Sequence, residues 1–270
     1  MLALLPRQNA TVFFADVSLL RRGGMLELLA GSKPNADAEY QKFVRQTGFD
    51  YSRDLDAIAG AASKEELFFV IRGRFDWARL REYATAHAGS CASAVCSVPT
   101  SRPGRWASFF ALQPDTMALA LSAASSAVNA LRPERRQSLQ KPLPRQPVWV
   151  QVSPSLLRDP TNLPLAVRFF AASLQPANSV LLSLTPAYVD SGAAFNLQLE
   201  AECPSEATAD SLRSQLEIQT KILSRELQAE REKPSPADLT GLLTSGSFQV
   251  VGKRAVGTWP VRKELLKTLE

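Results

Sequence analysis

The two residues whose types and spacing best suit catalysis are His87 and Cys91, four positions apart. A thiolate activated by a neighbouring imidazole is a common enzymatic nucleophile. Because His87 is the sole histidine of the chain, a Ser-His-Asp or Cys-His mechanism must use it. His87 is also expected at the end of a helix, where an imidazolium meets the negative end of the helix dipole. The sequence therefore leaves open a thiol-dependent enzyme, beside a structural or solvent-facing role for His87.

Acidic residues gather in two other places. Asp50, Asp54 and Asp56 lie close in sequence, but they lack the spacing and the distal glutamate of a calcium-binding loop. Capping and turn roles are therefore predicted for them. Glu65 and Glu66 are adjacent in an expected strand and would point to opposite faces, so they cannot easily share a substrate.

No motif of a known catalytic or nucleotide-binding site occurs in the sequence. It has no P-loop, no Gly-rich dinucleotide-binding turn, no zinc-protease HExxH and no GxSxG elbow. We therefore predict no catalytic residue, no metal site and no cofactor. Enzymatic activity stays open, but the sequence favours a protein that is not an enzyme.

The cysteines are Cys91, Cys96 and Cys203. The spacing of Cys91 and Cys96 is not that of a CxxC redox motif, and three thiols with one histidine make a poor metal set. One interpretation is that they are small buried residues. The other is a Cys91–Cys96 disulfide across a hairpin or loop, which would place the protein outside the cytoplasm.

The composition is that of a globular protein. The chain has 270 residues, of which 45% are hydrophobic and 21% charged, and a net charge of +5. This length suits one large or two ordinary domains. The mild positive charge permits contact with nucleic acid or anionic lipid without demanding it. No stretch approaches the ~20 apolar residues of a membrane span.

The stretch Thr47–Leu80 contains the clearest local signals. Its apolar run Leu67–Ile71 predicts a strand buried on both faces. Asp76 has the place of a helix N-cap, and Phe75 and Leu80 flank it with the spacing of a hydrophobic staple. The helix is expected from Trp77 to about His87. Motif residues of this stretch, for which structural roles are predicted, are Gly48, Phe49, Asp50, Arg53, Asp54, Asp56, Gly73, Phe75 and Asp76.

The chain is expected to have two similar halves. Residues 132–147 are rich in proline and arginine, which predicts a linker between 1–131 and 148–270. Short helices are expected around Met25–Leu29 and from about Ser122 to Leu131, and Gly48 is expected to end the helix that carries Tyr40, Phe43 and Val44. In Ala193–Cys203 apolar and polar residues alternate, which predicts a half-buried antiparallel strand with one solvent-exposed face. The order of expected strands and helices after residue 148 repeats that before residue 131. We therefore predict an internal duplication of α+β type, in which each half is an antiparallel sheet with helices packed on one face.

Three runs, LLPRQNATVFFADVSLLRR, TGFDYSRDLDAIAG and GRFDWARL, resemble a group of uncharacterised bacterial proteins common in acidobacterial genomes. The resemblance covers mainly residues 4–85. Members of this group usually carry a secretion signal and have no assigned activity. The resemblance therefore implies an exported or envelope-associated protein. The opening Met1–Pro6 of this chain lacks the basic region and the long apolar region of such a signal.

The leading hypothesis is a non-catalytic binding or structural protein of the bacterial cell envelope. A duplicated domain creates a cleft between its halves, where a small molecule or a partner protein is expected to bind. The first alternative is a thiol-dependent enzyme that uses Cys91 with His87. The second is weak nucleic-acid binding through the basic linker 132–147, although no aromatic residues interleave its arginines for base stacking.

Overall fold

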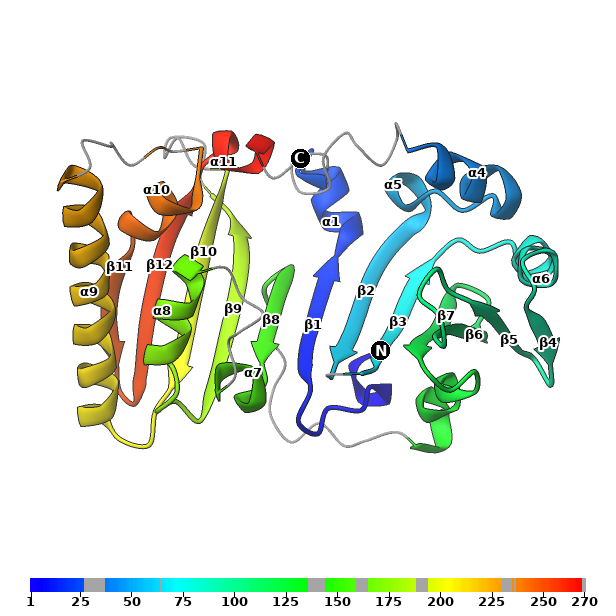
Figure 1. The fold of residues 1–270 in the computed structure, drawn as a ribbon, viewed down its shortest axis with the longest axis horizontal. Coiled ribbons are helices and arrows are strands. Elements are labelled where there is room, and N and C mark those ends of the chain that lie inside the picture. Colours follow the sequence, from blue (N-terminus) through cyan, green and yellow to red (C-terminus); the bar gives the residue numbers. More distant parts are fainter. Residues whose placement is uncertain are drawn as a thin grey trace. The chain divides into compact units, whose positions relative to one another are not determined.

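The computed structural model describes residues 1–26, 37–63, 65–135, 144–158, 165–187, 194–229, 235 and 237–268. Contacts divide the chain into two units, Met1–Arg145 and Gln146–Glu270. This division falls inside the segment predicted as a linker. Each unit has an antiparallel sheet with helices against it, so the predicted α+β fold is confirmed (Figure 1).

The first unit has a seven-membered run of antiparallel strands in the order β1-β2-β3-β7-β6-β5-β4. The chain leaves the sheet after β3, builds β4, β5 and β6, and returns to pair with β3 through β7. These strands are β1 (Thr11–Asp16), β2 (Leu55–Ala62), β3 (Leu67–Gly73), β4 (Ser90–Ala92), β5 (Val95–Pro99), β6 (Trp106–Gln113) and β7 (Thr116–Ser122).

The described α-helices of the first unit begin at capping side chains. Asp16, Asp37, Asp50 and Asp76 each accept hydrogen bonds from backbone N–H groups in the first turn of the following helix. The caps predicted at Asp50 and Asp76 are therefore confirmed. The helices are η1 (Leu2–Leu4), α1 (Val17–Arg22), α4 (Ala38–Thr47), α5 (Tyr51–Asp54), α6 (Trp77–Ala86), η2 (Ala127–Leu131) and η3 (Pro133–Arg135).

Different helices pack on the two faces of this sheet. Phe109 and Met117 pack with Leu80 and Ala84 of α6 on one face. Ser108, which points to the other face, accepts a hydrogen bond from the Val128 N–H of η2. The sheet is therefore a layer between α6 and η2.

Two local predictions need correction. The run Leu67–Ile71 is a strand, but only Phe68 and Val70 are buried, while its other residues are partly exposed. The helix expected from about Ser122 to Leu131 is shorter and tighter. Strand β7 continues to Ser122, where its pairing with Trp106 still satisfies the backbone, and only Ala127–Leu131 forms a 3₁₀ helix.

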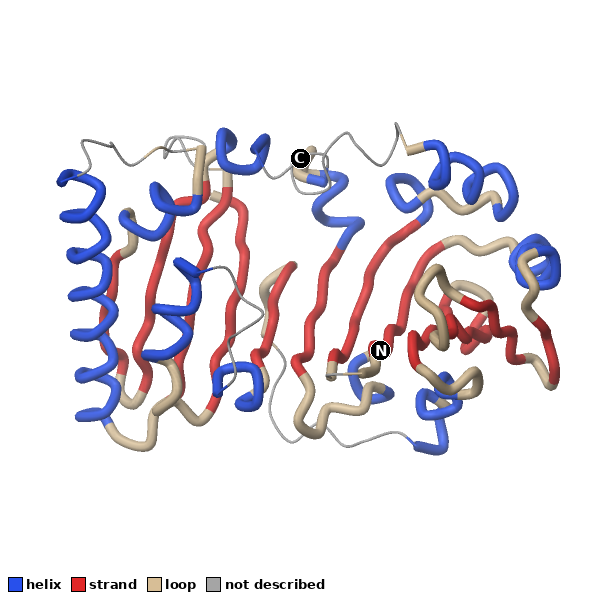
Figure 2. The backbone as a smooth tube through the Cα atoms, in the orientation of Figure 1, coloured by secondary structure: helices blue, strands red, loops and turns tan. Residues whose placement is uncertain are grey.

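The second unit has strands in the order β8-β9-β10-β12-β11. Helix α9 packs Leu212 and Leu216 onto Ala255 and Trp259 of this sheet, and Figure 2 shows the helices in front of the strands. The elements are β8 (Val148–Val152), α7 (Pro154–Arg158), α8 (Leu165–Ser173), β9 (Ser179–Pro186), β10 (Phe195–Glu202), α9 (Glu206–Ala229), α10 (Leu239–Thr244), β11 (Ser247–Val251), β12 (Arg254–Val261) and α11 (Lys263–Thr268).

The strand order of the second unit matches that of five strands in the first. In the first unit β1, β2 and β3 pair in sequence order, β7 pairs with β3, and β6 pairs with the outer edge of β7. In the second unit β8, β9 and β10 pair in sequence order, β12 pairs with β10, and β11 pairs with the outer edge of β12. The duplication itself stays a prediction. The helix expected around Met25–Leu29 falls mostly outside the described residues. No described helix is long and apolar enough to cross a membrane.

Candidate functional site

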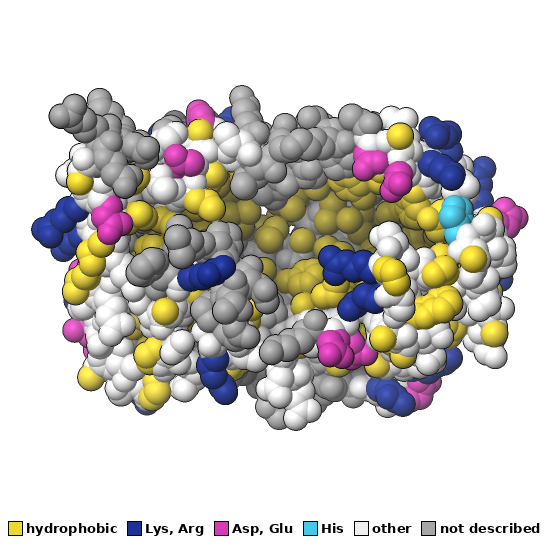
Figure 3. All heavy atoms as spheres, viewed as in Figure 1, with side chains coloured by type: hydrophobic (Ala, Val, Ile, Leu, Met, Phe, Trp, Pro, Cys, Tyr) yellow, Lys and Arg dark blue, Asp and Glu magenta, His cyan; other side chains and the backbone are white. Residues whose placement is uncertain are grey.

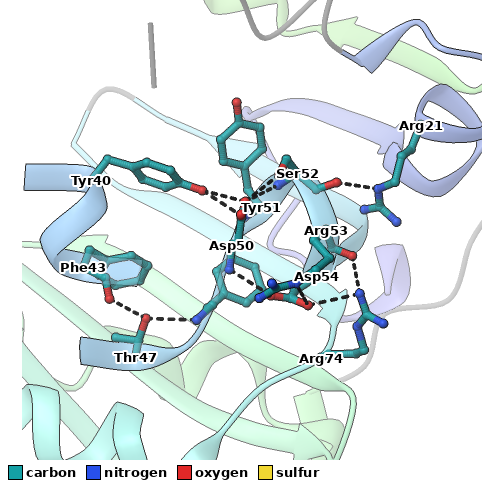
Figure 4. A network of polar contacts seen from close by, with 11 residues as sticks. Arg21, Tyr40, Phe43, Thr47, Asp50, Tyr51, Ser52, Arg53, Asp54 and Arg74 are labelled. Atoms are coloured by element: carbon teal, nitrogen blue, oxygen red, sulfur yellow. Dashed lines mark hydrogen bonds and ion pairs between the residues drawn. The ribbon is translucent and has the colours of Figure 1, made fainter. Parts of the chain in front are cut away.

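Most of the polar motif residues of Thr47–Leu80 form one network at the junction of α4, α5, β2 and β3 (Figure 4). At its centre is Asp54, whose side chain is 8% exposed. Arg53 donates two hydrogen bonds to this carboxylate, the Asp50 N–H donates one at 2.9 Å, and Arg74 lies 3.1 Å away. Burial raises the pKa of Asp54, but these bonds and charges outweigh it and bring the pKa below its ordinary value.

Asp50 has a second set of local partners. Its carboxylate accepts hydrogen bonds from the Ser52 N–H, the Ser52 hydroxyl and the Tyr40 hydroxyl, at 2.9, 2.7 and 3.0 Å. Burial opposes ionisation, yet these bonds and the Arg53 charge leave the pKa of Asp50 lowered. Burial, ahead of the nearby Asp50 charge, raises the pKa of Tyr40 to about 12. Tyr40 therefore stays a hydrogen-bond donor at neutral pH.

Two further arginines tie the network to its surroundings. Arg21 of α1 donates to the carbonyl oxygens of Ser52 and Leu55 and lies 3.7 Å from the Asp56 carboxylate. Arg74 donates to the Arg53 carbonyl. Every carboxylate of this network has cationic or N–H partners within the first unit. The network therefore has the chemistry of a scaffold that fixes α5 against β3. Among the described residues, no group of three or more potential metal ligands occurs.

The glycines of the motif have backbone roles. Gly48 ends α4 in the left-handed conformation, with φ 74°, as predicted from its place after the helix. At Gly73 a side chain would meet the Asp54 carbonyl oxygen at 2.3 Å. The two glycines allow α4 to end and β3 to pass directly beside α5. They thereby bring the following Phe49 and Phe75 close together.

An apolar pocket of about 460 Å³ lies beside this scaffold, entirely within the first unit. Its walls are aromatic. Phe49 and Phe75 stack with ring centroids 5.2 Å apart, and Phe43 of α4 meets Tyr83 of α6 edge to face at 5.4 Å. Leu80 of α6 completes the wall. The expected staple pair Phe75 and Leu80 thus lies in the lining of a pocket.

The floor of the pocket is the α6-side face of the sheet. It consists of Ile71 of β3, Met117 and Leu119 of β7, and Phe109 of β6. The apolar face continues across the sheet, because Ile58 and Ala15 lie in register beside Ile71 and are only half-buried. On the face seen in Figure 3, hydrophobic side chains accordingly gather in a hollow over β1, β2 and β3.

The remaining lining is the segment that follows β5, with Pro99, Thr100 and Ser101. Thr100 donates its hydroxyl to carbonyl oxygens of the same loop. Within the described part of the chain, no lining residue carries a charge. A cavity of this size and lining can hold an apolar molecule.

His87 and Cys91, considered as a catalytic pair from the sequence, do not form one in the structure. Cys91 and Cys96 face each other across the β4–β5 hairpin and form a disulfide with an S–S distance of 2.01 Å. The Cys91 sulfur is therefore not a nucleophile in this structure. The His87 ring stacks on Tyr83 at 4.1 Å, and its Nδ1 lies 2.9 Å from the Tyr83 carbonyl oxygen. His87 thus contacts Tyr83, a residue of the pocket wall, but does not itself line the pocket.

Sequence reasoning missed most of the pocket-lining residues. From the sequence, Leu119, Phe109 and Tyr83 have the pattern of ordinary core residues. The local sequence does not show whether the face of a strand or helix is covered by other side chains or borders a cavity. The repeated Phe-Asp pairs, Phe49-Asp50 and Phe75-Asp76, were the available signal. The linker 132–147 is described only in part, and the predictions of a site there and of a cleft between the halves stay predictions.

No protein-family model matches the chain, and no curated protein matches it significantly. Solved structures of the protein TP0453 are similar in fold. Its crystal form I has a TM-score of 0.53 and 11% identity, and covers 99% of this chain and 96% of that one. Crystal form III has a TM-score of 0.51 and 12% identity, with coverage of 99% and 96%. At this identity the likeness concerns the fold alone.

Proposed function

We propose that the chain is a non-catalytic binding protein whose first unit takes up a small apolar molecule in the pocket between α4, α6 and the sheet. The observation that supports this proposal is a cavity of about 460 Å³ with an uncharged, largely aromatic and aliphatic lining. Ligand sites are commonly of this size and apolar character. A ligand that fills the pocket removes this apolar lining from water, which favours binding.

The scaffold beside the pocket supports the same proposal. Asp54 and Asp50 satisfy their hydrogen-bonding capacity locally, and they hold Phe49 and Phe75 at the wall. The walls are therefore fixed before a ligand arrives. Such pre-organisation lowers the entropy that binding must offset.

Binding of N-phenyl-1-naphthylamine, a neutral apolar fluorophore, tests the proposal. Ala107 lines the pocket and is small, so Ala107→Phe should fill the space and weaken probe binding at least about tenfold. The matched control is Ala92→Phe on β4, because Ala92 is exposed, does not line the pocket and pairs with Val95 on the opposite face of the sheet. Equal probe affinity in the two variants, with both folded by circular dichroism, would overturn the proposal.

We also propose that the protein works outside the cytoplasm, in or near the bacterial cell envelope. The Cys91–Cys96 disulfide supports this, since structural disulfides persist in oxidising compartments. The resemblance of residues 4–85 to exported proteins points the same way. Alkylation of intact cells of the native host should leave Cys91 and Cys96 unlabelled until a reductant is added. Complete labelling of both cysteines without reductant would contradict this location.

A further inference from the structure

We infer that the occupant of the pocket is a single-chain amphiphile with an anionic head group, whose chain lies along β6 and whose head lies at the loop from Thr100 to Arg105. This inference rests on the proposed binding function and specifies its ligand. It follows from the direction in which the pocket runs and from the difference between its two ends.

The pocket is elongated along the strands. Met117 pairs with Ala111 near one end of β6, Leu119 pairs with Phe109, and Leu121 pairs with Ala107 near the other end. Lining residues extend from the Met117 row to Ala107 and its partner Val98. The four residue-to-residue steps of strand from Ala107 to Ala111 span about 13 Å. A groove of that length fits an extended chain better than a compact ring system.

One end of the pocket is closed by aromatic side chains. Phe75 and Phe49 lie beyond the Met117 row, where β3 leads into α6. Nearby, the Trp77 indole N–H donates to the Pro114 carbonyl oxygen at 2.9 Å, which ties the start of α6 to the β6–β7 turn. On the pocket face, the charges at this end are acidic or paired: Asp76 and Asp115 are acidic, and Arg79 lies 3.6 Å from the Asp76 carboxylate. Arg72 alternates with Ile71 and therefore belongs to the opposite face. An anionic head is disfavoured there.

The opposite end has polar and cationic groups. Thr100 and Ser101 belong to the lining, and Arg102 and Arg105 follow in the same loop. Arg102 is exposed, and Arg105 donates to the Leu121 carbonyl oxygen at 3.1 Å. Among the described residues, neither arginine has an acidic partner. Residues 83–114 contain no Asp or Glu.

Glu65 and Glu66 precede β3 near this end, and among the described residues neither forms an ion pair with Arg102 or Arg105. Glu65 is exposed, and the Glu66 carboxylate accepts a hydrogen bond from the Ser122 hydroxyl at 3.0 Å. Ser122 and Glu66 alternate with Leu121 and Leu67, so they belong to the opposite face of the sheet. The loop end therefore presents an unopposed positive charge to the pocket mouth. Because a charge inside the uncharged lining would lose its hydration, the head group must stay at this mouth.

The experiment compares dodecanoate with dodecanol, which share a chain and differ in head-group charge. Both are titrated into the full chain by displacement of N-phenyl-1-naphthylamine, below their aggregation limits. Dodecanoate should bind about two- to fivefold more tightly than dodecanol at low salt. This preference should shrink as salt screens the arginine charges.

Arg102→Glu should abolish or reverse the preference for dodecanoate while dodecanol binding is retained. The matched control is Arg72→Glu, an exposed arginine near the other end of β3 on the opposite face. Equal or tighter binding of dodecanol by the unaltered chain, or an unchanged preference in Arg102→Glu, would overturn the head-group inference alone. If the neutral fluorophore itself fails to bind, the proposed function fails as well.

Discussion

Phe49 and Phe75 stack almost parallel, with 13° between their planes, although they are 26 positions apart in the sequence. Each is followed at once by an aspartate that caps a helix, Asp50 for α5 and Asp76 for α6. The residue before an N-cap commonly packs against its own helix. Here the two such residues also pack against each other. The stacked pair thus links the starts of two helices to one wall of the pocket.

A double-mutant cycle measures this link. Phe49→Leu and Phe75→Leu should each lower the free energy of unfolding by about 1 kcal/mol, since both rings are half-buried. The double variant should lose less than the sum, with a coupling of about 0.5–1.5 kcal/mol for the aromatic pair. Urea denaturation gives all four values. Strict additivity would show that the stacking contributes nothing beyond each ring's own burial.

Gly73 should tolerate no side chain. A methyl group there meets the Asp54 carbonyl oxygen at 2.3 Å, and the nearest atoms all belong to the backbone of Asp54 and Leu55, which cannot shift as easily as a side chain. Gly73→Ala should cost about 2–3 kcal/mol, as overpacking typically does. Gly104→Ala is a suitable control, because Gly104 has φ 72° with open space around it. This control should cost about 1 kcal/mol from backbone strain alone. A smaller loss at Gly73 than at Gly104 would contradict the close approach of β3 to α5.

Asp54 should make stability fall in acid. Its pKa is lower in the folded chain than in the unfolded one. Its contribution is therefore fully present above the unfolded value of about 3.9 and is lost as the pH falls through the folded value. Asp54→Asn should lower the free energy of unfolding by about 2 kcal/mol at pH 7, because hydrogen bonds to a charged group are lost. Below pH 4, the free energy of unfolding of this variant should also decrease less with falling pH than that of the unaltered chain.

Asp56→Asn provides the comparison for that variant. Asp56 is 42% exposed and lies 3.7 Å from Arg21, so its ion pair should contribute less than about 1 kcal/mol. Thermal unfolding followed from pH 2 to pH 7 measures both variants. If Asp54→Asn and Asp56→Asn show the same acid profile, the buried network does not carry the pH dependence.

Reduction of the disulfide should destabilise the β4–β5 hairpin. Cys91 and Cys96 are five positions apart, so the closed loop is short and the entropic stabilisation is about 2 kcal/mol at most. Dithiothreitol should lower the Tm of the unaltered chain. The Cys91→Ser, Cys96→Ala double variant should start from that lower Tm and show no response to dithiothreitol. A Tm that reductant leaves unchanged in the unaltered chain, with both thiols then titratable, would exclude a stabilising role.

The sequence predicted the local features best. The caps at Asp50 and Asp76 and the left-handed Gly48 depend on residues within one or two turns, so their signals lie side by side in the chain. The alternating apolar and polar residues of β10 likewise predicted a strand with one buried and one partly exposed face. The 3₁₀ helix at Ala127–Leu131 was predicted as a longer α-helix, because the pairing that keeps Ser122 in β7 comes from Trp106, 16 positions earlier.

The pocket could not be predicted from the sequence for a similar reason. Its walls come from α4 and α6, its floor from three strands, and its polar end from the loop after β5. Whether Leu119 is covered by a neighbour or faces a cavity depends on the strand order, which local pattern does not encode. Only the recurrence of Phe before a capping Asp was visible.

The excursion of the chain between β3 and β7 has a consequence for synthesis on the ribosome. The floor of the pocket needs Ile71 beside Met117, and the strand that supplies Met117 begins only after the 42 residues 74–115 that follow β3. Closing so long a loop is slow compared with forming the local hairpins β4–β5 and β6–β7. Until residue 122 has left the exit tunnel, β3 has an unpaired edge. The nascent chain therefore exposes that edge, the kind of surface that chaperones shield, before any ligand can be held.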